Sequence, residues 1–261
     1  MKINFLTFYT EGPPRDSGLN LRHLREPTRL LVEKEFDEVV FYTPQKVSES
    51  LSEKYVREVP CSGAWGKIGN QEWKPAIILQ ELRQLSDNDI LVYHDINYQK
   101  YPVYKQFQNF RILCQKWLDW CEFDFFIPRS ILPPRYQING GDPLKRWCKE
   151  HSLRKLSTDY EFSANFSQCV ANLLVFKKNK VSMDFISEWL YHCSKEEYLN
   201  KLHYGCEKHP LLIKHLPEQS VANIILCNWI LEGKHNIPKN YPSFGFTDRN
   251  IQKPFFANAK P

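Results

Sequence analysis

Short apolar segments alternate with amphipathic ones along most of this chain, and that alternation limits the folds open to it. Runs rich in Val, Ile, Phe and Tyr predict strands over 3–10, 37–44, 89–97, 123–130 and 168–179. Apolar residues at helical spacing predict helices over 24–36, 47–59, 73–89, 103–121, 142–153, 181–193 and 218–233. A chain that alternates strand and helix is expected to form an α/β fold, with a mainly parallel sheet flanked by helices.

The length of 261 residues suits a single large α/β domain over 1–261. Glycine is scarce, with 10 residues, and no repeat or low-complexity tract is present, which argues against a fibrous or disordered chain. Residues 233–261 are rich in Pro and Asn, so we expect an irregular C-terminal tail there.

The formal net charge of +5 is modest, and basic residues are mixed with acidic ones along the chain. A nucleic-acid binder usually shows a basic face or stripe, so we expect no nucleic-acid partner. The small positive excess suits a phosphorylated small molecule, but an ordinary solvated surface explains it more simply.

The first residues contain a short apolar run without a small-residue cleavage site, which favours a first strand over a signal peptide. No apolar run approaches the roughly 20 residues of a membrane span. We therefore expect a soluble, cytoplasmic protein without a membrane span. The eight cysteines are scattered, which favours reduced, buried thiols over disulfides in such a chain.

A zinc site near the C-terminal third is one alternative. Cys206, His209 and His215 lie close together in the sequence, with Cys193 and His203 upstream. Structural zinc usually shows two tightly spaced ligand pairs, and only Cys206 and His209 have such a spacing. This pattern favours ordinary surface or core histidines over zinc.

The strand predicted at 89–97 ends on polar residues, namely His94, Asp95 and Asn97. In parallel sheets ligands bind beyond the carboxyl ends of the strands, so these residues are expected at a ligand crevice. Asp95 and Asn97, two apart, point the same way if the strand geometry persists. Their oxygens suit Mg²⁺ or Mn²⁺, although an Asp-x-Asn at a strand end is also a common turn cap.

The order of several short motifs resembles that of GT-A-type glycosyltransferases. The segment 72–97 carries Trp-Lys-Pro, an apolar helix and then Asp-x-Leu-x-Tyr-x-Asp, matched by Trp73, Lys74, Pro75, Asp89, Leu91, Tyr93 and Asp95. The segments 36–44 and 171–190 resemble further strands and a helix of that family. Residues 214–226 resemble a His-x-x-Asp-Gln-Ser segment that opens a helix, with Glu218 in place of the Asp.

The resemblance implies a Rossmann-type GT-A fold and a nucleotide-sugar-dependent hexosyl- or pentosyltransferase. It divides the chain into a donor half over 1–100 and an acceptor half over 101–232. The donor would be a nucleotide sugar, and the acceptor a glycan, a protein or a lipid-linked hydroxyl. The sugar, the nucleotide, the oligomeric state and the inverting or retaining outcome stay open.

The resemblance also implies a metal site of the DXD type at Asp95-Ile96-Asn97. A Mn²⁺ or Mg²⁺ ion there would bridge the donor diphosphate, with His215 as a further ligand. Asn97 stands where the family has Asp and brings no charge, so weaker metal binding, metal independence or lost activity all stay open. If Asp95 holds the ion, Asp95→Ala is expected to abolish turnover with little change in folding.

Roles for the other site residues follow from the same resemblance. Glu218 is the expected general base of an inverting reaction, beside Asp95 as the second catalytic residue. Expected contacts to the donor are Thr7, Tyr9, Thr10, Trp73, Lys74, Tyr93, His94 and Gln219. Asn165 and Gln168 are expected at the acceptor. The simpler alternatives are an exposed Lys74, buried strand-end residues, and core packing for Trp73 and Trp65.

Two other function classes compete with the transferase. One is a nucleotide-sugar-binding protein on the same fold that has little or no activity, which Asn97 favours. The other is a nucleic-acid-binding domain, supported only by the net charge and the aromatic content.

Overall fold

The computed structural model describes residues 1–9, 26–56, 71–95, 124–127, 129–131, 142–199, 211–213, 215–236 and 243–245. The chain divides into two compact units. Unit 1 comprises residues 1–126 and 172–187, and unit 2 comprises residues 127–171 and 188–261. The units differ from the expected division near residue 100, because the segment 172–187 returns to unit 1. That the two units form one domain stays a prediction.

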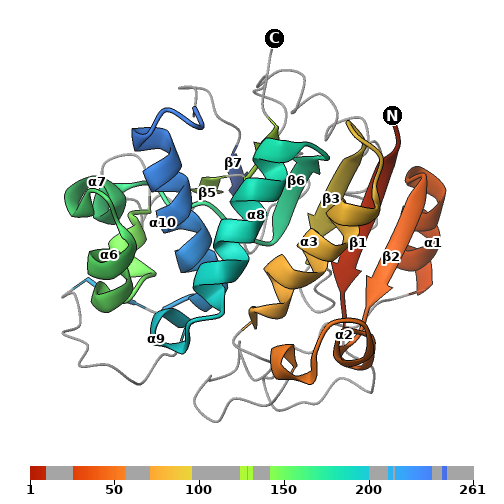
Figure 1. Ribbon diagram of the computed structural model, residues 1–261, viewed down its shortest axis with the longest axis horizontal. Helices are drawn as coiled ribbons and strands as arrows, with labels where there is room; N and C mark the ends of the chain where they lie inside the picture. The colour runs from red at the N-terminus through yellow and green to blue at the C-terminus, as the bar shows by residue number, and fades with distance from the viewer. Residues whose placement is uncertain are drawn as a thin grey trace. The chain divides into compact units, whose positions relative to one another are not determined.

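Unit 1 is built on a mixed, mostly parallel sheet with the strand order β2-β1-β3-β6-β4 (Figure 1). Strand β1 (Ile3–Phe8) runs parallel to β2 (Glu38–Tyr42) and to β3 (Ile90–His94). Strand β6 (Leu173–Lys177) is antiparallel to both of its neighbours, β3 and β4 (Phe125–Phe126). The predicted α/β class and mainly parallel sheet are thus confirmed, with β6 as the reversed strand.

The central strands are buried over their whole length. All residues of β1 and β3 are buried, as expected for strands that are covered on both faces. Two carboxylates fix the start of β1: the backbone N–H of Lys2 donates to Asp89 Oδ1 at 2.6 Å, and that of Ile3 to Asp37 Oδ2 at 2.7 Å. The resulting alignment of β1 and β3 brings their carboxyl ends to the same edge of the sheet.

The described helices of unit 1 are α1 (Glu26–Glu35), α2 (Pro44–Ser50), α3 (Trp73–Gln84) and the first part of α8 (Lys180–Cys193). Helix α3 packs against β3 and lies in front of it in Figure 1. The helix predicted over 47–59 is not continuous, because α2 ends at Ser50 and a short 3-10 helix, η1 (Glu53–Tyr55), follows. Ser52 starts this second turn, since its hydroxyl accepts from the Lys54 N–H.

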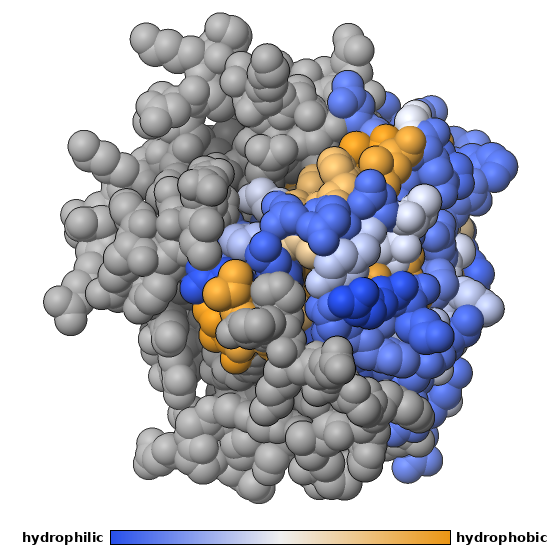
Figure 2. All heavy atoms as spheres, turned by 90° about the vertical axis from the view of Figure 1, so that its left-hand side faces the viewer, coloured by the Kyte–Doolittle hydropathy of each residue, from blue (hydrophilic) through white to orange (hydrophobic). Residues whose placement is uncertain are grey.

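Unit 2 is a set of helices around one buried helix, α10 (Pro217–Leu231). Helix α10 contacts α6 (Glu150–Leu156), α7 (Tyr160–Asn165) and α9 (Glu196–Leu199). It is apolar on nearly every side, which is typical of a central helix. On the face in Figure 2, most described residues are hydrophilic and the apolar ones form small patches.

Several predicted elements of unit 2 are shorter than expected. The predicted strand 123–130 is two strands, β4 in unit 1 and β5 (Arg129–Ile131) in unit 2. The predicted helix 142–153 is the 3-10 helix η5 (Leu144–Arg146) followed by α6. The tail is not wholly irregular, because β7 (Ser243–Gly245) pairs in parallel with β5.

None of the described helices is both long enough and apolar enough to cross a lipid bilayer. Four cysteines lie among the described residues, and each is a buried free thiol: Cys148, Cys169, Cys193 and Cys227. For these four, the expectation of reduced, buried thiols is confirmed.

Candidate functional site

Asp95 comes directly after β3, at the carboxyl end of a strand that runs parallel to β1. Its backbone N–H donates to the carbonyl of Asn172 at 2.8 Å, so hydrogen bonding between β3 and the start of β6 fixes its position. Its side chain keeps 14% of its surface exposed. The predicted place of Asp95, at a strand end, is confirmed.

Both oxygens of the Asp95 carboxylate contact side chains of unit 1. The hydroxyl of Tyr93 donates a short hydrogen bond to Oδ1. Lys74 Nζ lies 3.5 Å from Oδ2. Tyr93 and Asp95 are two residues apart and therefore point to the same side of the strand end. Lys74 reaches this carboxylate from the first turn of α3.

Lys74 is a buried lysine, with only 2% of its side chain exposed. Its ammonium lies 5.9 Å from the ring centroid of Trp73 and 5.5 Å from that of Tyr93, within the range of cation–π attraction. Removing an ammonium from water is costly unless a charge partner compensates for it, and Asp95 is such a partner. The alternative of an ordinary exposed lysine is therefore wrong.

Trp73 precedes Lys74 and packs in the core of unit 1. Its ring stacks on Phe8 with the centroids 3.8 Å apart and the planes inclined by 19°. The side chain is buried. This is the core packing that was the simpler alternative for Trp73, and its contact with a donor stays a prediction.

The polar residues at the ends of β1 and β3 differ in how far they are buried. The hydroxyl of Thr7 donates to the carbonyl of His94 at 2.7 Å and is buried, so it joins β1 to β3. Contact of Thr7 with a donor stays a prediction. Tyr9 is partly exposed, and His94 is buried at the end of β3. Thr10, Trp65 and Asn97 lie outside the described residues.

Glu218 and Gln219 stand in the first turn of α10, in unit 2. Glu218 is buried, and a carboxylate in that turn is stabilised by the helix dipole. Gln219 Oε1 accepts from the Ala171 N–H at 3.1 Å and so fixes the chain just before β6. Since Asp95 belongs to unit 1, a cleft lined by both Asp95 and Glu218 stays a prediction.

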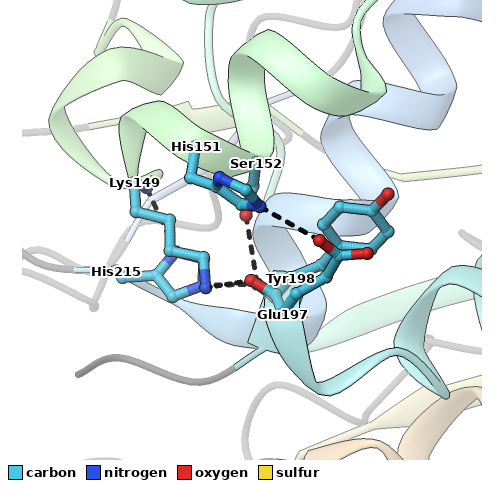
Figure 3. Close-up of polar contacts among 6 residues, drawn as sticks. All are labelled: Lys149, His151, Ser152, Glu197, Tyr198 and His215. Carbon is cyan, nitrogen blue, oxygen red and sulfur yellow. Dashed lines mark hydrogen bonds and ion pairs between the residues drawn. The ribbon is translucent and has the colours of Figure 1, made fainter. Parts of the chain in front are cut away.

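His215 is held by the protein at both of its ring nitrogens (Figure 3). The backbone N–H of Lys149 donates to Nδ1 at 3.3 Å, which makes Nδ1 the acceptor of the ring. Nε2 then carries the proton and donates to the carbonyl of Tyr198 at 2.9 Å. A metal ligand needs a ring nitrogen with an available lone pair, and both nitrogens are engaged by the protein here. A role of His215 as a metal ligand stays a prediction.

The two predicted acceptor residues have different surroundings in unit 2. Asn165 is exposed, and its Oδ1 accepts from Lys145 Nζ at 2.6 Å. Gln168 is buried, and its Nε2 has no hydrogen-bond partner among the described residues. Contact of either residue with an acceptor stays a prediction.

Asn223, in the middle of α10, is a positioning residue that the sequence reasoning missed. Its Oδ1 accepts from the Cys169 N–H at 2.6 Å, and its Nδ2 donates to the Cys169 carbonyl at 2.9 Å. The side-chain amide therefore makes the same two hydrogen bonds to the backbone before β6 that a neighbouring strand would make. The available signal was one amide inside the apolar run 221–227.

Asp142 in unit 2 gives a pH-dependent prediction. Burial raises the pKa of this carboxyl to about 6, against opposing contributions from the Trp147 hydrogen bond and from Arg146. Because the folded pKa exceeds the ordinary value of 3.8 for an aspartate, the contribution of Asp142 to stability falls as the pH rises from 3.8 to about 6, and it is constant above that pH. Asp142→Asn mimics the neutral form. We expect it to be more stable than the wild type at pH 8 by about 1 kcal/mol, and not at pH 4.

Urea unfolding at the two pH values tests this prediction. The exposed Asp87 supplies the control, since Asp87→Asn is expected to change stability equally at both pH values. An Asp142→Asn variant that is less stable than the wild type at pH 8 would show that the Arg146 and Trp147 contacts outweigh the cost of burial.

The residues around Asp95 fit a divalent ion poorly. An ion bound to this carboxylate would lie beside the Lys74 ammonium, and like charges 4 Å apart repel by roughly 4 kcal/mol per charge pair near a protein surface. Across the described ranges, no group of three or more His, Cys, Asp or Glu side chains is arranged to hold a metal. Cys206, His209 and Asn97 fall outside those ranges. Binding of Mn²⁺ or Mg²⁺ stays a prediction.

No protein-family model matches this chain, and no curated protein or solved structure is significantly similar to it. The resemblance to glycosyltransferases therefore rests on the sequence motifs alone.

Proposed function

We propose that this protein is a nucleotide-sugar-dependent glycosyltransferase, of the hexosyl- or pentosyltransferase class, with a GT-A-type fold. One observation carries the proposal: Lys74, from the Trp-Lys-Pro segment, pairs with Asp95, the last residue of the Asp-x-Leu-x-Tyr-x-Asp segment. These two parts of the family pattern are 21 positions apart in the sequence (95 minus 74) and meet at the carboxyl end of β3. Ligands of open α/β sheets bind at that edge.

Glycosyl transfer needs a positive charge at the leaving diphosphate and an aligned acceptor hydroxyl. In this proposal Lys74 supplies positive charge to the phosphates, and the partly exposed Tyr9 lies near the nucleoside. Glu218 would take the proton of the acceptor hydroxyl in an inverting reaction, and a retaining reaction needs no such base. The acceptor is a glycan, a protein or a lipid-linked hydroxyl.

The second candidate is a protein that binds nucleotide sugars on the same fold without transferring the sugar. Asn97, in place of the family's Asp, favours it, and so does the engagement of both Asp95 oxygens by Tyr93 and Lys74. Both candidates require donor binding, and only the transferase releases nucleoside phosphate from the donor over time.

A thermal-shift panel of UDP-, GDP-, TDP- and CMP-sugars, each with and without Mn²⁺, tests donor binding. One donor is expected to stabilise the protein by about 2.7 kcal/mol at a concentration a hundred times its dissociation constant, and free glucose is expected to have no effect. Release of the nucleoside phosphate, followed by chromatography, then separates the transferase from the inactive binder. A panel without any shift would contradict both candidates.

A further inference from the structure

A side-chain cation lies beside Asp95 in this fold. Lys74 Nζ lies 3.5 Å from Asp95 Oδ2, and α3 delivers it there from its first turn. Trp73, its neighbour, is fixed by its stack on Phe8. The backbone that carries Lys74 is thus anchored in the core, so the ammonium is pre-organised at the strand end.

Tyr93 and Asp95 complete the arrangement from the other side. The Tyr93 hydroxyl donates to Asp95 Oδ1, which orients the carboxylate so that Oδ2 faces Lys74. The Tyr93 ring also lies 5.5 Å from the ammonium. These contacts hold Asp95 as the partner of a lysine, and not as an open carboxylate.

The charges at this strand end also favour a lysine over a metal. Asp95 and Lys74 cancel each other, and Asn97 adds no charge. A carboxylate that is paired with an ammonium attracts a divalent ion less strongly than an unpaired one, because such ions respond to the charge of their ligands. Only 2% of the Lys74 side chain is exposed, so a phosphate oxygen has to displace a covering group to reach the ammonium. The 3.5 Å separation from Asp95 is longer than the roughly 2.8 Å of a charge-assisted hydrogen bond, so the ammonium can exchange this contact for one with a phosphate.

We propose that Lys74 is the cation that binds the donor diphosphate, that donor binding needs no divalent metal, and that Asp95 is a positioning residue for Lys74. This inference rests on the proposed function. It assigns to Lys74 the electrostatic role that the family resemblance assigns to a metal ion at Asp95.

Isothermal titration of UDP, GDP and TDP, in Mn²⁺ and in EDTA, tests the assignment. In the wild type, the nucleotide that binds most tightly is expected to have the same dissociation constant in both buffers. Lys74→Met is expected to weaken binding in EDTA by on the order of tenfold to a hundredfold. Mn²⁺ is expected to restore binding to this variant, because the Asp95 carboxylate is released from its ammonium.

Two variants make the result specific. In Lys74→Met/Asp95→Asn, Mn²⁺ is expected to restore nothing, since no carboxylate is left to hold it. Lys180→Met is the matched control, because Lys180 also pairs with a carboxylate, Asp184, but on the exposed surface. Lys180 follows β6 in the chain. Lys177, the last residue of β6, pairs with Ile90, and Ile90 is at the opposite end of β3 from Asp95. Nucleotide binding by Lys180→Met is expected to equal that by the wild type.

The outcomes separate this inference from the proposed function. If EDTA abolishes nucleotide binding by the wild type, the Lys74 assignment is overturned while the proposed function stands. If none of the three nucleotides binds in either buffer while a donor of the thermal-shift panel does, the Lys74 assignment is overturned and the proposed function stands; if the panel gives no shift either, both fail. Thermal unfolding of each variant shows whether lost binding reflects lost folding, and Mn²⁺ rescue of Lys74→Met can occur only in a folded protein.

Discussion

Asp95→Ala is expected to lower the free energy of unfolding by about 3 kcal/mol, because it leaves the Lys74 ammonium buried without its carboxylate. Removing one partner of a buried ion pair costs far more than removing a surface pair. The Tyr93 hydroxyl loses its acceptor in the same variant. The measurement is urea unfolding of the purified variant followed by circular dichroism.

The structure therefore revises the expectation, drawn from the sequence, that Asp95→Ala leaves folding almost unchanged. The double variant Lys74→Met/Asp95→Ala is expected to recover much of the loss, since neither charge remains. Asp184→Ala breaks the exposed pair with Lys180 and is expected to cost no more than about 0.5 kcal/mol. Equal losses for Asp95→Ala and Asp184→Ala would mean that the Lys74–Asp95 contact contributes no more than a surface pair.

Asn223→Ala is expected to destabilise unit 2 by about 3 kcal/mol. Its side chain satisfies both the N–H and the carbonyl of Cys169, and it also donates to the Gln219 carbonyl at 2.8 Å. Asn223 and Cys169 are buried, so neither backbone group can turn to water when the amide is removed. A buried polar group without a partner costs about 1 to 3 kcal/mol, and two are created here.

Asn228 offers a matched control on the same helix. It also bridges a backbone N–H and a carbonyl, those of Thr158 and Leu156, but Thr158 is exposed. Water can replace the amide there, so Asn228→Ala is expected to cost about 1 kcal/mol. Thermal unfolding of the two variants at one pH compares them, and an Asn223→Ala variant as stable as Asn228→Ala would contradict the argument from burial.

The sequence predicts the order and the approximate places of the strands in unit 1, since that information is local, but the predicted strands are longer than the observed ones. Apolar runs bounded by polar residues identify β1 and β3, and the parallel arrangement follows from the helices between strands. The place of Asp95 at a strand end follows from the same pattern. Short helices such as α7 and α9 were missed, because four to six residues give too few turns for a periodic signal.

Side-chain partners across the fold could not be predicted in this way. The burial of Lys74 depends on β3, 16 or more positions further along the chain (90 minus 74), which no local pattern reveals. The same is true of His215, whose two ring nitrogens contact Lys149 and Tyr198. A histidine held by backbone groups looks the same in sequence as one that binds a metal.

The central claim is that the donor diphosphate binds at the carboxyl end of β3, on Lys74. A crystal structure of the protein with the donor that gives the largest thermal shift tests this directly. The account predicts a phosphate oxygen within hydrogen-bonding distance of Lys74 Nζ, with Asp95 still in contact with Tyr93. A donor bound elsewhere, with the Lys74–Asp95 pair undisturbed, would contradict it.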